Sequence, residues 1–150
     1  MLELKCQIHE ACMAKVLNRI ASLEAEVENL KTSAASDTKS SMGDKYETAR
    51  EMINLEKEKI SEQLADAQRM KQTLESIEVE TQNPKAALGS LIKSSTCYFF
   101  LSVSLGKVVV NGKEVFVISP ASPIGKGLMG LQVNNSIEFA GKIERIIAVA

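Results

Sequence analysis

The feature that most constrains this chain is the scarcity of helix-breaking residues in its first half. Residues 1 to 83 contain no proline and a single glycine, Gly43. Proline and glycine disfavour the interior of a helix more than any other residues, whereas Ala, Leu, Glu, Lys and Gln, which favour it, are frequent on both sides of Gly43. The sequence therefore predicts two long helices, separated by a polar, Ser-rich segment around Gly43.

Each predicted helix carries an apolar seam whose spacing alternates between three and four residues, as in a heptad repeat. The first seam consists of Cys6, His9, Met13, Val16, Ile20, Leu23, Val27, Leu30 and Ala34. The second consists of Tyr46, Ala49, Ile53, Glu56, Ile60, Gln63, Ala67, Met70, Leu74 and Ile77. We expect Leu55 and Leu64 to widen the second stripe. Neither helix can bury its stripe alone.

The connection between the two predicted helices is short, about ten residues. Short connections favour antiparallel packing of the helices that they join. We therefore expect residues 1–82 to form an antiparallel coiled-coil hairpin with its tip near residues 36–46. Each helix would be roughly 50 Å long at 1.5 Å per residue. The same heptads are also typical of a dimerisation rod or spacer, and that alternative stays open.

The character of the chain changes near residue 80. Residues 1–80 contain 11 Lys/Arg and 16 Asp/Glu, a net charge of −5, whereas residues 81–150 contain 7 and 3, a net charge of +4. The pair Asn83-Pro84 ends the second helix, because a residue before proline avoids the helical conformation. Two architectures are thus joined in one chain.

Residues 83–150 have the pattern of a small β-rich domain. Apolar and β-branched runs occupy residues 89–94, 98–105 and 107–119, and two more flank Gly141. The pair Asn111-Gly112 is a strong signal for a two-residue hairpin turn. With five or six strands and one short helix near residues 124–131, the predicted fold class is α+β.

Composition excludes several classes of protein. A net charge of −1 argues against generic nucleic-acid binding, and we expect no sequence-specific DNA binding. No apolar run approaches the roughly 20 residues of a membrane span, and the first residues lack the features of a secretory signal. Three cysteines do not resemble a disulfide framework. We expect a cytoplasmic protein without membrane contact.

The sequence offers no catalytic arrangement. Its one histidine, His9, lies in the first predicted helix, without a recognisable Ser-His-Asp set. Cys6 and Cys12 flank this histidine, but they would lie about 9 Å apart along a helix, too far to share one zinc ion. We expect core or seam roles for all three, and no enzyme activity, cofactor, metal site or small-molecule substrate.

One C-terminal segment, ISPASPIGKGLMGLQVNNSIEF at residues 118–139, resembles the bacterial Gre transcript-cleavage factors. In that family Ser-Pro-Ile precedes a short helix, a glycine and a strand that begins after Gly-Asp. The matching positions are Ser122, Pro123, Ile124, Leu128 and Gly130, whereas Asn134-Asn135 replace Gly-Asp. Gre factors combine an N-terminal antiparallel coiled coil with a small C-terminal domain of FKBP-like fold. The resemblance implies that fold for residues 83–150.

The resemblance also implies a partner, RNA polymerase. Gre factors dock their C-terminal domain at the rim of the polymerase secondary channel and insert the coiled coil. Acidic residues at its tip then help to hold a metal ion at the polymerase active centre, where backtracked RNA is cut. The docking residues implied here are Ser122, Pro123, Ile124, Gly125 and Lys126. Pro123 and Ile124 would make this face apolar, and Lys126 would make it cationic.

The predicted tip departs from the Gre pattern. When the alignment is anchored on Tyr46, Ala49 and Glu51, Lys39 and Met42 occupy the positions of the acidic pair. Neither side chain can bind magnesium, which prefers carboxylate oxygens. Asp37 and Asp44 lie nearby and are candidate metal ligands only under an alternative reading. The tip residues expected near the polymerase active centre are Asp37, Lys39, Ser40, Ser41, Met42, Gly43, Asp44, Lys45 and Tyr46.

The resemblance thus implies a Gre-like protein of a bacterial type. It would bind RNA polymerase through the secondary channel and modulate transcription elongation without the usual acidic tip pair. One alternative is a stimulator of transcript cleavage that uses Asp37 and Asp44. The other is a coiled-coil interaction or dimerisation module with no polymerase contact.

Overall fold

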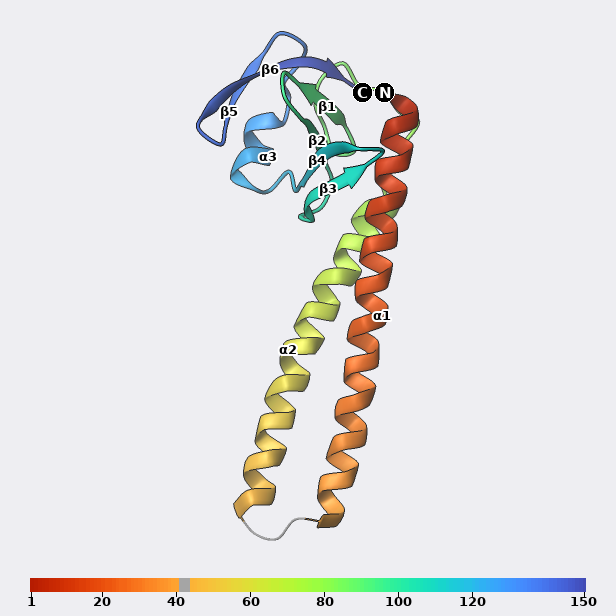
Figure 1. Cartoon of the computed structure of the whole chain (residues 1–150), viewed down its shortest axis with the longest axis vertical. Helices are drawn as coiled ribbons and strands as arrows, with labels where there is room; N and C mark the ends of the chain where they lie inside the picture. The colour runs from red at the N-terminus through yellow and green to blue at the C-terminus, as the bar shows by residue number, and fades with distance from the viewer. Residues whose placement is uncertain (41–43) are drawn as a thin grey trace. The chain divides into compact units, whose positions relative to one another are not determined.

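The computed structural model describes the backbone of residues 1–40 and 44–150, and the side chains of residues 1–33 and 47–150. Two long helices, α1 (Leu2–Ser40) and α2 (Asp44–Glu75), come first in the chain (Figure 1). The later elements are β1 (Leu91–Ser94), β2 (Tyr98–Leu101), β3 (Gly106–Val110), β4 (Lys113–Ile118), α3 (Pro123–Leu128), β5 (Ser136–Phe139) and β6 (Lys142–Val149). The predicted α+β class is confirmed.

The chain forms two compact units. One combines residues 1–14 with residues 72–150 and contains the sheet, and the other consists of residues 15–71. Helix α1 therefore contributes to both units. The predicted division into domains 1–82 and 83–150 stays a prediction. Within the described ranges 1–40 and 44–150, no helix is both long enough and apolar enough to cross a membrane.

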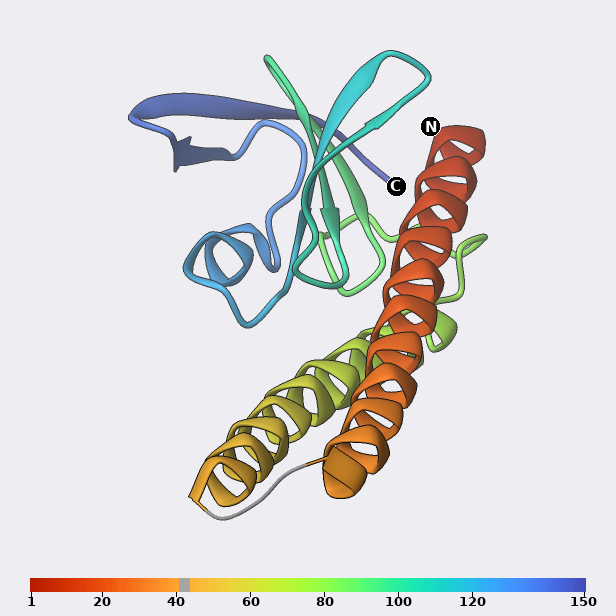
Figure 2. The same ribbon diagram turned by 60° about the horizontal axis from the view of Figure 1, so that its bottom comes forward.

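In the unit of residues 15–71, α1 and α2 lie side by side and run in opposite directions (Figures 1 and 2). Leu23 of α1 is buried in one apolar cluster with Ile60 and Ala67 of α2. Partly buried side chains surround this cluster: Ile20, Val27, Leu30 and Leu64. All except Leu64 are members of the two predicted seams, and Leu64 is one of the two residues expected to widen the second.

Two details differ from the expectations. α1 continues to Ser40 and α2 begins at Asp44, so the helices are separated by fewer residues than the ten expected. Residues 34–40 contain no proline or glycine, and nothing in them stops a helix. Leu55 is 66% exposed and does not widen the buried stripe. At about 100° per residue it lies roughly 140° around α2 from Ile60, whereas Leu64 lies only about 40° away.

In the other unit the six strands are ordered β3-β4-β2-β1-β6-β5. Neighbouring strands are antiparallel except for β2 and β4, which are parallel. Asn111 and Gly112 join β3 to β4, and both have positive φ angles (51° and 72°), as a type I′ turn requires. The predicted hairpin is therefore confirmed, and it leaves β3 at one end of the sheet.

One face of the sheet carries an apolar core that positions α3. The rings of Phe99 and Phe116 each lie 5.0 Å from the ring of Phe139, edge to face. Leu128 of α3 is buried in this core, and Ile124 packs against it. The short helix is therefore held against the sheet just after the end of β4 (Figure 2).

Residues 1–14 form part of the same unit as the sheet. Leu4, Ile8 and Cys12 are buried and recur every four residues, so one face of α1 is apolar here. Lys5 lies beside them and is also buried, and its Nζ donates a hydrogen bond to the carbonyl oxygen of Thr81 at 2.7 Å. This part of α1 thus contacts the segment that follows α2.

Candidate functional site

The residues expected at the tip lie outside the described part of the chain. Residues 41–43 are not described, and of residues 37–40 and 44–46 only the backbone is. The contributions of Asp37, Asp44 and the two nearby lysines therefore stay predictions. The described candidate site is the docking segment implied for residues 122–126.

Ser122 fixes the start of α3. Its Oγ accepts a hydrogen bond from the backbone N–H of Gly125 (3.0 Å) and donates one to the carbonyl oxygen of Ser119 (2.7 Å). Pro123 follows in the first helical turn, where a missing N–H costs nothing and the fixed φ suits the helix. The Ser-Pro pair therefore determines where the chain turns from the end of β4 into α3.

Gly125 lets this turn close tightly. A Cβ atom at this position would lie 1.9 Å from the carbonyl oxygen of Ser119 and 2.9 Å from the Cα of Pro120. Both neighbours are backbone atoms, which cannot move aside without displacing the turn. Gly125 is accordingly buried, and its contribution is to the shape of the segment and not to a contact surface.

An open groove of about 390 Å³ lies beside the start of α3. It is lined by Ser104, Gly106, Val117, Ile118, Ser119, Ser122, Pro123 and Ile124, and we call it the α3 groove. Three of the five predicted docking residues line it. The other two differ from them: Gly125 is buried, and Lys126 is exposed outside the lining.

Five of the eight residues that line the α3 groove lie outside the predicted docking residues. Gly106 begins β3 and Ser104 lies just before it. Val117 and Ile118 end β4, and Ser119 follows them. The start of β3 meets α3 because β3 pairs antiparallel with β4, with Gly106 opposite Val117, and α3 follows directly after β4 in the chain. The sequence did contain one indication of these residues, the two apolar residues Val117 and Ile118 just before Ser119. Only the arrangement of the strands shows which way they face.

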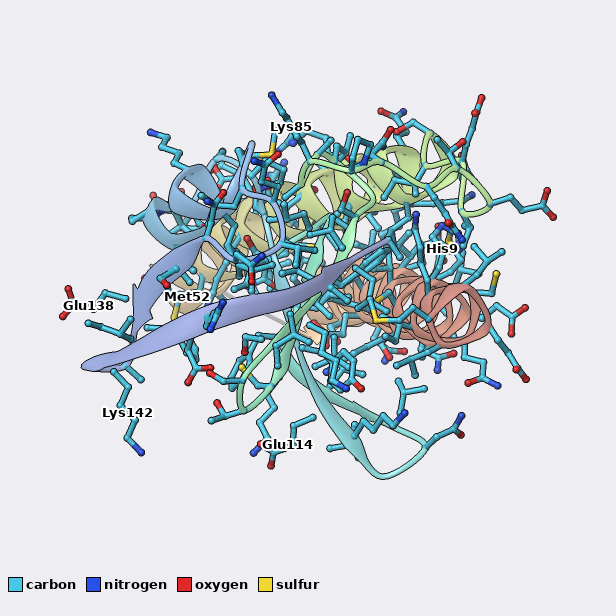
Figure 3. The ribbon with its side chains drawn as sticks, turned by 90° about the horizontal axis from the view of Figure 1, so that it is seen from above. His9, Met52, Lys85, Glu114, Glu138 and Lys142 are labelled. Carbon is cyan, nitrogen blue, oxygen red and sulfur yellow. The ribbon has the colours of Figure 1, made fainter. Side chains whose placement is uncertain are left out.

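The segment that carries this site has few acidic side chains. Residues 81–150 contain three acidic side chains. Glu114 pairs with Lys107, whose Nζ lies 2.5 Å from its carboxylate, and Glu144 is buried. Glu138 is exposed and points outward (Figure 3). The exposed cations of this segment, among them Lys126, therefore face few neutralising carboxylates.

Glu144 is a second feature that the sequence did not indicate. Its side chain is only 3% exposed, yet its carboxylate accepts hydrogen bonds from the hydroxyls of Ser94 (2.9 Å), Ser95 (2.8 Å) and Thr96 (2.7 Å). These bonds, that of Thr96 above all, hold the pKa of Glu144 below its ordinary value, although burial opposes the shift. Since the donors come from the end of β1 and the turn that follows it, Glu144 ties that turn to β6.

His9 makes a structural contact with the end of α2. Its Nε2 lies 2.7 Å from the carbonyl oxygen of Leu74 in the last turn of α2. His9 is labelled in Figure 3. Helix ends leave carbonyls without partners within the helix, and α2 has no basic residue of its own in its last turn. No group of three or more metal-ligating side chains occurs where side chains are described.

Comparisons with known proteins add no relative. The chain matches no family model, no curated protein and no solved structure. The Gre resemblance therefore rests on residues 118–139 and on the order of helices and strands along the chain.

Proposed function

We propose that this chain is a Gre-like bacterial transcription factor, itself not an enzyme. It binds RNA polymerase through the secondary channel, in the cytoplasm, and modulates elongation without the usual acidic tip pair. In this proposal α1 and α2 form an antiparallel coiled coil, and residues 83–150 form an FKBP-like domain. The buried seam of Leu23, Ile60 and Ala67 supports the first assignment, and the six-stranded sheet with its short helix is compatible with the second.

The observation that carries the proposal is the α3 groove. Ser122, Pro123 and Ile124, which the Gre resemblance selects from sequence, line one depression. Its apolar walls come from β4 and α3, and the exposed Lys126 lies in the same short helix. An apolar groove beside a cation fits a partner surface that presents an apolar side chain next to an acidic one.

A competition experiment with an authentic Gre factor tests docking. The chain should displace a labelled Gre factor from RNA polymerase, and the double variant Pro123→Asp/Lys126→Glu should do so at least about tenfold less well. Both side chains are exposed, so folding should be retained, as circular dichroism can verify. Lys85→Glu changes an exposed lysine outside the groove and is the matched control. Failure of the unaltered chain to compete would exclude the proposal.

The cleavage alternative makes a separate prediction. A cleavage stimulator would release short 3′ RNA fragments from an arrested polymerase complex, and Asp37→Ala or Asp44→Ala would abolish the release. We expect no such fragments. We also expect both variants to compete for polymerase as well as the unaltered chain does, because neither residue belongs to the docking face.

One observation favours the interaction-module alternative. Met52 and Leu55 on α2 are each 66% exposed, and Leu55 lines a depression with Glu51, Asn54 and Glu58. Exposed apolar residues on a helix are typical of partner contacts. If α2 serves self-association, the chain should sediment as a dimer that Leu55→Glu converts to a monomer, and it should not compete for polymerase.

A further inference from the structure

Lys5 is an unusual lysine because its side chain is almost completely enclosed. Only 2% of the residue is exposed, although lysine is among the residues least often buried without a partner. It lies on α1 between the buried side chains of Leu4 and Ile8. Its burial therefore needs a compensating interaction.

The described contacts compensate Lys5 only in part. Its Nζ donates one hydrogen bond, to the carbonyl oxygen of Thr81, whereas an ammonium group has three donors. The ion pairs formed by the described side chains do not include Lys5. Burial accordingly lowers the pKa of Lys5 from its ordinary value. The site holds a cation that forms no ion pair with a described side chain.

A cavity of about 180 Å³ adjoins this lysine. Its lining residues are Lys5, Ser76, Ile77, Glu78, Thr81, Asn83 and Leu88, all within the unit that contains the sheet. The wall is divided in character: Ser76, Thr81 and Asn83 are polar, whereas Ile77 and Leu88 are apolar. The hydroxyl of Thr81 already donates to Glu78 at 3.2 Å.

We propose that this cavity, which we call the Lys5 cavity, binds a short-chain monocarboxylate. The carboxylate accepts hydrogen bonds from the free donors of Lys5, and the alkyl chain lies against Ile77 and Leu88. This inference does not depend on the proposed interaction with RNA polymerase. The bound molecule is a ligand that occupies the Lys5 cavity, and it undergoes no reaction there.

The size and charge of the site define this class of ligand. A volume of about 180 Å³ accommodates roughly six water-sized groups at about 30 Å³ each, which is the number of heavy atoms in butyrate. The wall contributes one cation, Lys5, and one acid, the exposed Glu78. A single buried ammonium balances one negative charge, and Glu78 disfavours a second. Monoanions are therefore favoured over phosphate and dicarboxylates.

The test is a titration of the full chain with sodium butyrate at constant sodium concentration. Amide NMR spectra recorded at each step monitor the titration. Butyramide, which has the same shape without the charge, is the matched control ligand, and sodium chloride controls for salt. We expect saturable shifts at residues 76–88 with butyrate and none with butyramide. Equal effects of the two ligands, or no saturable shift with butyrate, would overturn the proposal.

Two variants separate the site from general effects. Lys5→Met replaces the ammonium with an apolar chain of similar length that tolerates burial, and it should weaken butyrate binding by at least about tenfold. Leu88→Glu adds an acid to the wall at a partly exposed position and should weaken binding similarly while leaving Lys5 in place. Lys85→Met, at the outward-pointing lysine of Figure 3, should bind butyrate normally. Undiminished binding by Leu88→Glu would contradict the location of the site.

Discussion

At Gly125 the backbone of α3 passes so close to the preceding turn that a single methyl group has no room. The position that a Cβ would occupy lies 1.9 Å from the carbonyl oxygen of Ser119. We expect Gly125→Ala to lower the free energy of unfolding by at least about 2 kcal/mol. Urea denaturation monitored by far-UV circular dichroism measures this change.

Gly127, one half-turn further along α3, is the matched control. A Cβ there would meet only side-chain atoms of Ile137, the nearest being Cδ1 at 3.2 Å, the flexible end of a side chain that can rotate away. Alanine also favours helix over glycine. Gly127→Ala should therefore change stability by less than about 1 kcal/mol. If both variants lost a similar free energy of unfolding, the close approach of backbone atoms at Gly125 would not be the reason that this position requires glycine.

Glu144 allows a second prediction at the scale of single residues. Glu144→Gln removes the charge that three hydroxyls stabilise, and should lower stability at neutral pH by about 1–3 kcal/mol. Because the folded state holds the pKa of Glu144 below its ordinary value, the contribution of its charge is present above the carboxyl pKa of the unfolded chain. It disappears as the pH falls through that value towards the folded pKa.

The measurement is urea denaturation of both proteins at several pH values between neutral and acid. The unaltered chain should lose its advantage over Glu144→Gln as the pH falls below the ordinary carboxyl range. Glu138→Gln, a change at an exposed glutamate on β5, controls for the general effect of removing a carboxylate. A constant difference between the first two proteins at every pH would mean that the charge of Glu144 is not the stabilising factor.

At the scale of elements, the packing of α1 against α2 depends on few side chains. Leu23 is 6% exposed and clusters with Ile60 and Ala67, so Leu23→Ala should cost about 2–4 kcal/mol through the lost burial and the cavity left behind. Leu55→Ala is the matched control at an exposed position of α2. It should cost less than about 0.5 kcal/mol. Thermal unfolding of the helical signal compares the two, and equal losses would contradict the seam.

The elements themselves were largely predictable because their causes are local. The absence of proline, the heptad spacing of apolar residues and the Asn-Gly pair each act over a few residues. The two long helices and the β3–β4 hairpin are present as predicted. The two exceptions have different causes. Leu55 is apolar but lies on the side of α2 away from the buried seam. Residues 36–40 are polar, but they contain no proline or glycine, so α1 continues through them.

The candidate sites were only partly predictable because they depend on distant neighbours. The predicted docking residues supply three of the eight residues that line the α3 groove, whereas Ser104 and Gly106 reach it only because β3 pairs with β4. The burial of Lys5 and Glu144 was not visible either. Thr81 lies 76 residues from Lys5, and Ser94 lies 50 residues from Glu144, and no sequence period links such pairs.

At the scale of the whole molecule, the division of α1 between two compact units has a practical result. Residues 1–14 belong with the sheet, and Leu4, Ile8 and Cys12 are buried there. We therefore expect a fragment of residues 83–150 to fold poorly. A chain in which a short Gly/Ser linker replaces residues 15–71 should retain the sheet. Dispersed amide NMR spectra identify the folded forms, and a well-folded 83–150 fragment would contradict this division.

The position of β3 at the end of the sheet has one more consequence. β3 pairs with β4 alone among the described strands, so its other side presents backbone donors and acceptors that a strand from another molecule can use. Val109 on this strand is 62% exposed, and its apolar side chain would favour pairing with a strand of another molecule. Repeated pairing of this kind produces fibrils. β3 is only five residues long, and the charged Lys107 lies two residues from Val109. Short edge strands and charged side chains are features that limit such pairing.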